Sequence, residues 1–507
     1  MRFRLETAVF LSGAALMGLE IAGSRVLAPV FGTSVFVWGS LITTFLAALA
    51  IGYAAGGKLA DARPDPAILS NVLTGSGLLL WLLFVRPDPL LDLFAAVPVP
   101  DRFRALLAAL ALFAVPSVLM GAVTPFAVRL CARDVATVGS SAGRLSAIST
   151  AGSILGTFAM TFFLIPAFAL PPILFGLGAT LVVAGLLCVP RPSLSRVATL
   201  AAATVAGGSV YLLGTPEPAS PVPGGKVVFQ KETAYHRIRV VDQGLRRALY
   251  FDNRLQGYRY RAGAAEGESS YVDGLLVGLA LRRSPAASAV AIGLGPGMLP
   301  ALLASARPEV SVTSIEIDPE VVRVAGAYFG FRADANDRVL VGDGRRELDR
   351  RVDGADVIFQ DAYFADSIPF HLITREFFEL ARRKLTEDGV LAANFGGLLT
   401  GEGNALFWSA HKTVGQVFPR VYVLCPELAD GKRTFASTAI LLASKSPVRL
   451  TREELVERAQ AVGRALGRPH VATWAEALYD GEVFGAELPT LTDAYSPTDA
   501  LQHLRRR

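Results

Sequence analysis

A glycine-rich turn and a series of carboxylates that follow apolar runs are the residues of this sequence whose spacing could do chemistry. The turn is Gly293-Leu-Gly-Pro-Gly297, and its glycines permit a sharp bend and close approach of a ligand to the backbone. Glu316 lies 23 residues after Gly293, where a carboxylate can accept both hydrogen bonds of a ribose diol. Asp343, in Gly342-Asp-Gly344, suits an adenine amino group. Asp361 ends a fourth run.

The glycine turn alone would also fit a dinucleotide-dependent oxidoreductase. The G-x-G-x-x-G spacing of that class is absent, because Met298, Leu299 and Pro300 follow Gly297. A nucleoside that carries a methyl-sulfonium group fits the pattern better.

Short apolar runs that alternate with helical stretches must position these residues. The alternation indicates a mostly parallel, doubly wound sheet, which binds ligands outside the carboxyl ends of its strands. The strand-like runs are 289–292, 310–317, 339–341, 356–359 and 389–394. Before them, 227–229, 238–241 and 248–251 predict a small antiparallel unit.

The first 214 residues have the composition of a membrane domain. They contain 13 Lys and Arg and 8 Asp and Glu, whereas the remaining residues contain 36 of each sign. About seven segments are long enough to cross a hydrocarbon core of about 30 Å. They are 5–27, 35–57, 67–85, 105–129, 145–165, 168–189 and 196–213. Dense small residues, such as Gly152 and Gly156, predict close helix packing.

A linker with four prolines and three glycines, 214–225, cannot continue a helix or a strand. We therefore predict a transmembrane domain over 1–214, a linker over 215–225, an antiparallel β unit over 226–287 and a nucleotide-binding catalytic domain over 288–507. The charges of residues 215–507 balance, so no basic surface for nucleic acid is expected.

The sidedness of the membrane domain is predicted from its loops. Nine Lys or Arg residues would lie on the side of the N-terminus and four on the other, which makes the N-terminus cytoplasmic. Seven crossings would then place the second half outside the cell. We nevertheless expect a bacterial inner-membrane protein whose catalytic domain faces the cytoplasm, where sulfonium nucleosides are made. An even number of crossings satisfies both expectations.

No metal site is expected from the sequence. The three cysteines show no C-x-x-C spacing, and no two of the five histidines form an H-x-x-x-H pair.

Taken in order, several motifs between Glu232 and Phe395 resemble those of the spermidine synthase family. That family comprises aminopropyltransferases built on the Rossmann-like, methyltransferase-type fold. The motifs are Leu249-Tyr-Phe-Asp-Asn-Arg-Leu-Gln256, Glu268-Ser-Ser-Tyr271, Glu316-Ile-Asp318, Gly342-Asp-Gly344, Asp361 and Ile368-Pro-Phe-His-Leu-Ile-Thr-Arg-Glu-Phe-Phe378.

The resemblance implies that the adenosyl donor is held by a set of residues after the strands, and that Asp361 is the catalytic base or the carboxylate that orients an attacking amine. The implied donor-binding residues are Gln256, Tyr271, Gly293, Gly295, Gly297, Glu316, Asp343 and Gly344. His236, Asp366 and Tyr495 are candidates for substrate contact, and Asp493 is a further residue that could reach a substrate.

Several positions depart from the family pattern. Pro296 replaces an aspartate that holds the donor's amino group, and Val272-Asp273 replaces histidine and glutamate. Asp366 could substitute for a missing second aspartate, and His236 stands where a glutamine is usual. These changes affect the polyamine and donor-tail side of the pocket more than the adenosyl side.

Three hypotheses follow. The first is a membrane-embedded enzyme that transfers aminopropyl from decarboxylated S-adenosylmethionine to an amine such as putrescine and releases methylthioadenosine. The second enzyme acts on S-adenosylmethionine itself, by methyl transfer or by release of methylthioadenosine. The third is a nucleoside-sensing domain coupled to a membrane carrier. The expected partners are the amine and the lipid bilayer, and homodimer formation is left open.

Overall fold

The computed structural model describes most of the chain. The described residues are 2–501, except 33, 85–86, 100, 133–134, 190, 214–219, 262–269, 334–335, 364–367, 397–398, 400–403, 427–437, 482, 484, 486 and 499–500. The chain divides into two compact units. One comprises Met1–Ala219 with Lys231–Arg237, and the other comprises Ser220–Gln230 with Ile238–Arg507.

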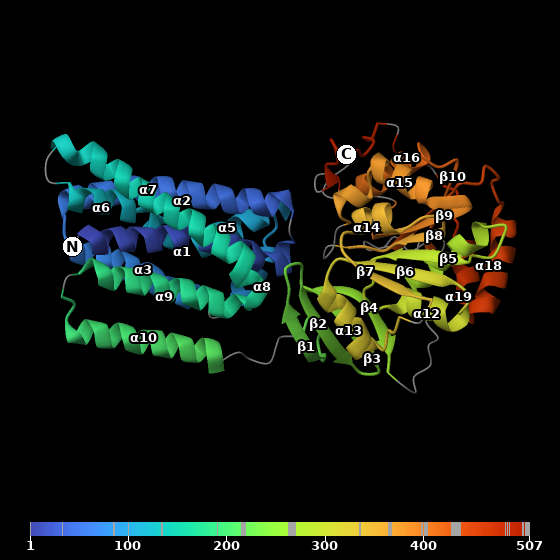
Figure 1. Ribbon diagram of the computed structural model, residues 1–507, viewed down its shortest axis with the longest axis horizontal. Helices are drawn as coiled ribbons and strands as arrows, with labels where there is room; N and C mark the ends of the chain where they lie inside the picture. Colours follow the sequence, from blue (N-terminus) through green and yellow to red (C-terminus); the bar gives the residue numbers. More distant parts are fainter. Residues whose placement is uncertain are drawn as a thin grey trace. The chain divides into compact units, whose positions relative to one another are not determined.

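The first unit is a bundle of long apolar helices (Figure 1). Its elements are α1 (Arg2–Phe31), α2 (Val35–Ala62), α3 (Pro66–Phe84), α4 (Asp88–Ala95), α5 (Asp101–Gly121), α6 (Val123–Cys131), α7 (Val135–Ala159), a π-helical turn η1 (Met160–Leu164), α8 (Ile165–Ala167), α9 (Leu170–Cys188) and α10 (Leu194–Leu213). Within the described residues, six helices are long and apolar enough to cross a membrane. The apolar part of α10 is shorter, Val197–Ser209. The predicted number of about seven therefore fits roughly.

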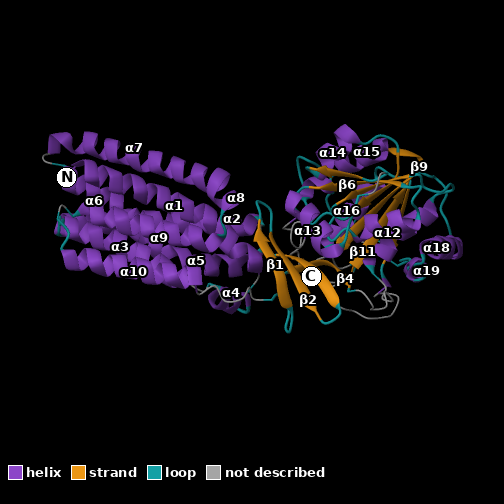
Figure 2. Cartoon of the chain, turned by 60° about the horizontal axis from the view of Figure 1, so that its bottom comes forward, coloured by secondary structure: helices purple, strands orange, loops and turns teal. Residues whose placement is uncertain are grey.

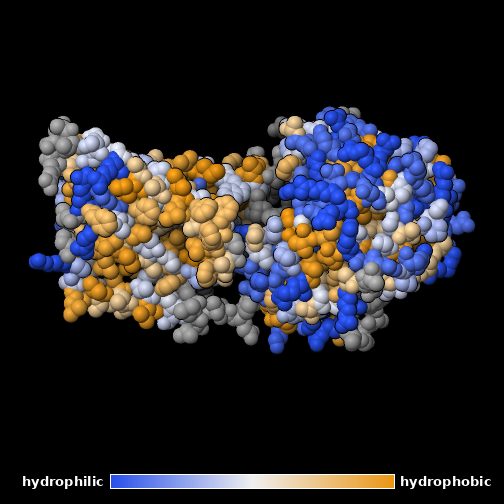
Figure 3. Space-filling model, viewed as in Figure 1, coloured by the Kyte–Doolittle hydropathy of each residue, from blue (hydrophilic) through white to orange (hydrophobic). Residues whose placement is uncertain are grey.

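The bundle exposes many hydrophobic side chains, as Figure 3 shows for one face. Leu46, Ile51, Leu82 and Phe162 are among the exposed ones. Such a surface is compatible with an apolar environment. Inside the bundle, α1 packs against α7, α9 and α5. A Cβ atom at Gly152 or Gly156 of α7 would overlap the backbone carbonyl of Phe10 or Ala14 of α1. The small residues therefore permit backbone contact between these helices, as the sequence predicted.

A four-stranded antiparallel sheet, in the order β1-β2-β3-β4, precedes the larger domain (Figure 2). Its strands are β1 (Lys226–Glu232), β2 (Arg237–Gln243), β3 (Arg246–Phe251) and β4 (Arg254–Tyr260). Ile238 and Val240 of β2 and Leu249 of β3 pack on Val321 and Val324 of α13. The predicted antiparallel unit is thus present, and its apolar side rests on a helix of the following domain.

The larger domain is built on a seven-stranded sheet in the order β10-β11-β9-β8-β5-β6-β7. Five of its strands are parallel, namely β5 (Ser288–Ile292), β6 (Ser311–Glu316), β7 (Arg338–Val341), β8 (Ala355–Gln360) and β9 (Leu385–Gly396). Two more, β10 (Arg420–Leu424) and β11 (Thr438–Ser444), are antiparallel to their neighbours. The predicted doubly wound, Rossmann-like fold is confirmed.

Helices cover both faces of this sheet. One face packs against α14 (Gly344–Arg351), η3 (Phe370–Leu372), α15 (Arg375–Lys384) and α16 (Ala405–Gly415). The other packs against α11 (Tyr271–Leu276), η2 (Val277–Leu281), α12 (Met298–Ala306), α18 (Arg452–Leu466) and α19 (His470–Glu476), whereas α13 (Pro319–Phe329) lies against the small sheet. Because both faces are covered, the central strands are buried and almost wholly apolar.

The strand order brings the predicted residues together. β5 lies between β6 and β8, and Ile292 pairs with Ile315 on one side and with Gln360 on the other. The residues after these three strands are Gly293, the end of β6 at Glu316, and Asp361. They therefore share the carboxyl edge of the sheet, where ligands of such folds bind.

Candidate active site

The glycine turn after β5 adopts a conformation that its sequence explains. Gly293, Gly295 and Gly297 all have positive φ angles, of 93°, 53° and 76°. A Cβ atom at Gly293 would overlap the backbone carbonyl of Asp361, so the turn passes directly over the end of β8. Gly297 precedes the first residue of α12, and the turn therefore leads into a helix N-terminus.

Glu316 fixes this turn from the neighbouring strand. Its Oε2 atom accepts a hydrogen bond from the backbone N–H of Leu294, at 3.0 Å. Its Oε1 atom accepts one from the backbone N–H of Asp318, also at 3.0 Å. Burial raises the pKa of this carboxyl. Each carboxylate oxygen can accept a second hydrogen bond, so the group can support the loop and still accept from ribose hydroxyls.

Replacing Glu316 by Gln is expected to weaken nucleoside binding by about 1–3 kcal/mol. The amide of glutamine has only one acceptor oxygen, so its NH₂ group must face one of the two backbone N–H donors, of Leu294 or Asp318. The amide also lacks the negative charge that strengthens hydrogen bonds to the ribose hydroxyls. Calorimetry with methylthioadenosine measures the effect. Glu309→Gln, an exposed change in the turn that follows α12, is the control. An unaltered affinity in Glu316→Gln would exclude a ribose-binding role.

Asp343 is engaged by two groups at the start of α14. Its side chain accepts a hydrogen bond from the backbone N–H of Arg346, at 3.0 Å, and caps the helix. His371 Nε2 lies 2.9 Å from Asp343 Oδ2, and this hydrogen bond holds the pKa of the carboxyl below its usual range. Gly344 is the first residue of α14 and lies against Ile292. His371 lies in the segment 368–378 that carried the resemblance, but no signal in the sequence marks it as a partner of Asp343.

Asp361 is the carboxylate with the most unusual environment in the described chain. The Tyr271 hydroxyl donates to Asp361 Oδ2 at 2.9 Å, and Asn394 Nδ2 donates to Asp361 Oδ1 at 2.8 Å. Burial raises the pKa of Asp361 to about 6, although both hydrogen bonds favour the ionised form. A carboxylate with a pKa near 6 is ionised at neutral pH and is a stronger base than an ordinary aspartate.

Two amide oxygens near the end of the central strands are buried without a hydrogen-bond partner among the described residues. They are Oδ1 of Asn394, whose Nδ2 contacts Asp361, and Oε1 of Gln360, whose Nε2 donates to the backbone carbonyl of Leu372. Such atoms are uncommon inside proteins. Sequence reasoning missed Asn394, because no motif marks it and only the pairing of β8 with β9 brings it to Asp361.

The pH dependence of kcat/KM should change when the hydrogen bond from Tyr271 to Asp361 is removed. Replacing Tyr271 by Phe removes a donor that stabilises the ionised Asp361, so the pKa of Asp361 rises. We expect the acid limb of the kcat/KM profile to move to higher pH by about one unit, the equivalent of about 1.4 kcal/mol. Tyr363→Phe is the control, because that hydroxyl donates to the backbone carbonyl of Asn394, at 3.0 Å. An acid limb that does not move in Tyr271→Phe would contradict the assignment.

Other predicted residues lie outside the Asp361 cluster. Gln256 is on β4, and its amide donates to the backbone carbonyl of Arg254, at 3.3 Å. His236 closes the turn after β1, where burial lowers its pKa to about 3 and keeps it neutral. Tyr495 is 59% exposed in a C-terminal turn. Asp366 lies outside the described residues. Their substrate or donor roles stay predictions.

Two acidic residues have structural partners. Asp493 forms an ion pair with Arg345 at 2.7 Å and accepts from the Thr374 hydroxyl, so it fastens the C-terminal turn. Asp273 is fully buried, caps α11 and receives two hydrogen bonds from Arg468, at 2.7 and 2.9 Å. The described residues contain no group of three His, Cys, Asp or Glu side chains that could hold a metal ion.

The second half of the chain is similar to known transferases. The spermine/spermidine synthase domain matches residues 298–441. The polyamine aminopropyltransferase of Vibrio vulnificus (strain CMCP6) is 32% identical over 235 residues, which cover 46% of this chain and 75% of that protein. The eEF1A lysine and N-terminal methyltransferase of Homo sapiens is 28% identical over 214 residues, 38% of this chain and 29% of that protein.

Among solved structures, a probable spermidine synthase from Corynebacterium glutamicum ATCC 13032 aligns with a TM-score of 0.40 and 18% identity, covering 53% of this chain and all of that one.

The parallel sheet gives the domain the Rossmann-like, methyltransferase-type fold, and the matched synthase domain makes it a transferase. Within this class, the 75% coverage of the Vibrio vulnificus protein decides the assignment. The chain belongs to the spermine/spermidine synthase family of polyamine aminopropyltransferases, and the resemblance seen in the sequence is confirmed.

Proposed function

We propose that the enzyme transfers the aminopropyl group of decarboxylated S-adenosylmethionine to a primary amine and releases methylthioadenosine. The amine lone pair attacks the propyl carbon bonded to the sulfonium sulfur. The new C–N bond forms as the C–S bond breaks, and its electron pair stays on sulfur, which becomes the neutral thioether. The proton that the amine must lose goes to the carboxylate of Asp361. The reaction needs positioning and a base rather than covalent catalysis.

The observation that supports this proposal most strongly is the position of Asp361. It directly follows the central strand β8, its pKa of about 6 suits a base at neutral pH, and Tyr271 and Asn394 hold both of its oxygens. The Oδ1 atom of Asn394, which has no hydrogen-bond partner among the described residues, would accept a second N–H of the amine. Glu316 and Asp343 at neighbouring strand ends supply acceptors for the nucleoside.

Product analysis with two donors tests the proposal. The purified full-length chain is given decarboxylated S-adenosylmethionine or S-adenosylmethionine, each with and without a panel of primary amines that includes putrescine. We expect methylthioadenosine only from the decarboxylated donor and only when an amine is present. Release of methylthioadenosine from S-adenosylmethionine without an amine would contradict aminopropyl transfer.

One observation favours a second function, in which the enzyme consumes S-adenosylmethionine itself. Pro296 lies in the turn where the resemblance predicts an aspartate for the donor's amino group, and the human protein reported above is a methyltransferase. The same product analysis separates the two functions. Methylated amine and S-adenosylhomocysteine would indicate methyl transfer.

We also propose that the catalytic domain faces the cytoplasm. Six crossings would place Ser220 in the same compartment as the N-terminus and the nine basic residues on its side. This arrangement agrees with the excess of Lys and Arg on the cytoplasmic side. It also places the catalytic domain in the compartment where the donor is made. A seventh crossing by α10 would separate them. In intact cells, we therefore expect an impermeant thiol reagent to label neither Ala132→Cys nor Ser220→Cys in a cysteine-free background. Permeabilised cells provide the control. Labelling of Ser220→Cys alone in intact cells would place the enzyme outside.

A further inference from the structure

Tyr271, which donates to Asp361, is the first residue of a very short helix. α11 comprises six residues and continues as the 3₁₀ turn η2. Helices of this length are unstable by themselves, so the position of Tyr271 depends on the contacts that hold α11 from outside. Burial, followed by the charge of Asp361, raises the pKa of Tyr271 well above its ordinary value. The hydroxyl therefore stays protonated and can donate to Asp361 throughout the pH range of an enzyme assay.

The N-terminus of α11 is held by a capping box. The Ser270 hydroxyl accepts a hydrogen bond from the backbone N–H of Val272, at 3.1 Å. The Asp273 carboxylate accepts one from the backbone N–H of Ser270, at 2.9 Å. Asp273 is fully buried. A buried carboxylate is stable only when a cation as well as hydrogen-bond donors compensate its charge.

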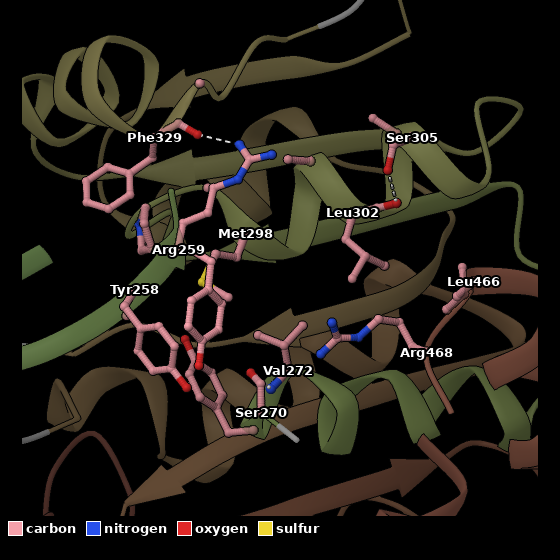
Figure 4. Close-up of a pocket in the computed structure, with 18 of the residues that line it drawn as sticks. Tyr258, Arg259, Ser270, Val272, Met298, Leu302, Ser305, Phe329, Leu466 and Arg468 are labelled. Atoms are coloured by element: carbon pink, nitrogen blue, oxygen red, sulfur yellow. Dashed lines mark hydrogen bonds between the residues drawn. The ribbon is translucent and has the colours of Figure 1, made fainter. Parts of the chain in front are cut away.

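Arg468, which lies 195 positions later in the sequence, supplies this cation. Its Nε atom donates to Asp273 Oδ1 at 2.7 Å, and its Nη2 atom donates to Asp273 Oδ2 at 2.9 Å. This bidentate geometry fixes the direction of the carboxylate as well as its distance. Figure 4 shows the Arg468 side chain extending toward Ser270 and Val272, and these three residues and Tyr271 line a cavity of about 750 Å³.

The backbone of Arg468 is itself fixed between two helices. Arg468 follows Gly467, the C-cap of α18 with a φ of 64°, and its N–H donates to the carbonyl of Gly463 at 2.8 Å. Its own carbonyl accepts from the N–H of Val471 in α19, at 3.2 Å. A Cβ atom at Gly463 would lie 2.7 Å from that carbonyl oxygen. The guanidinium therefore extends from a well-defined point.

A second contact holds α11 beyond its capping box. A Cβ atom at Gly274 would lie 2.5 Å from the Trp474 ring of α19 and 2.8 Å from Ile440 of β11, so the helix backbone approaches both side chains closely. Loss of the ion pair would leave this support in place and release the N-terminal end of α11, which carries Tyr271. A shift of about 1 Å there is enough to break an O–H···O hydrogen bond of ordinary length.

The effect of Arg468 on Asp361 would therefore be indirect. Burial raises the pKa of Asp361, and the hydrogen bonds from Asn394 and Tyr271 lower it. Tyr363, the other titratable group close to Tyr271, donates to the backbone carbonyl of Asn394. The charge of Arg468 is paired with that of Asp273. We expect Arg468 to act through the position of Tyr271 rather than through its own field.

We propose that Arg468 and Asp273 form a positioning clamp, which holds the Tyr271 hydroxyl on Asp361 and thereby favours the ionised form of the proposed base. The inference rests on the proposed role of Asp361 in aminopropyl transfer. Both residues of the clamp act through Tyr271 and are positioning residues rather than catalytic ones.

Arg468→Lys tests the clamp, because lysine keeps the positive charge but cannot hold both carboxylate oxygens in one fixed geometry. We expect the acid limb of the kcat/KM profile to move to higher pH by about half a unit or more. In a Tyr271→Phe background, Arg468→Lys should cause no further movement, because the hydrogen bond is already absent. Arg452→Lys, at an arginine of α18 that is paired with Asp480, is the matched control and should leave the acid limb in place.

The titration of Asp361 gives a second measurement, which requires no reaction. NMR of the full-length chain with ¹³C-carboxyl-labelled aspartate, assigned with Asp361→Asn, should show that Arg468→Lys raises the pKa of Asp361. If this variant does not fold, Asp273→Asn combined with Arg468→Gln replaces it, because that combination leaves no buried charge unpaired.

A lower Tm with an unmoved pKa of Asp361 would indicate a merely structural role and overturn the clamp. A shift by Arg468→Lys that persists in the Tyr271→Phe background would also overturn it, because the effect would not pass through Tyr271. Absence of transfer with every donor and amine would overturn the proposed function, and the NMR titration would still decide whether the clamp acts on Asp361.

Discussion

Replacing Asp361 by Asn is expected to lower kcat about 10²–10⁴-fold while changing the affinity for methylthioadenosine by less than about tenfold. The amide keeps the shape of the carboxylate and can still contact Tyr271 and Asn394, but it cannot accept the proton of the amine. Steady-state kinetics combined with calorimetry on the same preparation separates the two effects. Normal turnover in Asp361→Asn would overturn the catalytic assignment.

The same variant carries a stability signature that is independent of activity. The folded-state pKa of Asp361 is about 6, above the ordinary value of an aspartate, so its contribution to stability is lost as pH rises through 6. Above that pH, the native protein holds a charge that the unfolded chain would solvate better. We expect Asp361→Asn to be more stable than the wild type at alkaline pH, by about 1–2 kcal/mol, and not at a pH well below 6. Thermal unfolding at the two pH values measures the difference.

Replacing Gly293 by Ala is expected to destabilise the catalytic domain by about 3 kcal/mol or more. The backbone has a φ of 93°, which side chains other than glycine rarely adopt, and the new Cβ atom would overlap the carbonyl of Asp361. The turn or the end of β8 would have to move, so activity should fall together with the Tm. Denaturant unfolding of the full chain in detergent measures the loss.

Gly295→Ala is the matched control for this prediction. Gly295 also has a positive φ, of 53°, but no atom lies within 4 Å of a Cβ atom placed there. Replacing Gly295 should lower the free energy of unfolding by only about 1–2 kcal/mol, because alanine must adopt the left-handed backbone conformation but meets no neighbouring atom. Equal stability of the two variants would contradict the close approach of Gly293 to the backbone carbonyl of Asp361.

Those parts of the fold with strong local signals could be predicted from the sequence. The apolar segments identified the long helices of the first unit, and the alternation after residue 288 identified the parallel sheet, because both signals come from residues close together in the chain. The length of α10 as a membrane span could not be settled in the same way. Its apolar core, Val197–Ser209, is short of what a crossing needs, so composition alone leaves the count between six and seven.

Contacts between residues distant in sequence could not be predicted. Asn394 contacts Asp361 only because β9 pairs with β8. Arg468 donates to Asp273, although the two residues are 195 positions apart in the sequence. The latter pair gives one of the departing residues a structural role. Asp273 completes the capping box of α11 and is paired with Arg468. The contact of His371 with Asp343 could not be predicted either, because Asp343 follows β7 and His371 follows β8.

The proposed transfer is tested most directly by following the aminopropyl group itself. Decarboxylated S-adenosylmethionine labelled in its propyl carbons is incubated with the full-length enzyme and an amine, and all products are identified by mass spectrometry. The mechanism predicts that the label moves to the amine, one aminopropyl group for each unlabelled methylthioadenosine released, and that Asp361→Asn stops both. Label that stays on the nucleoside, or methylthioadenosine released without a labelled amine, would contradict it.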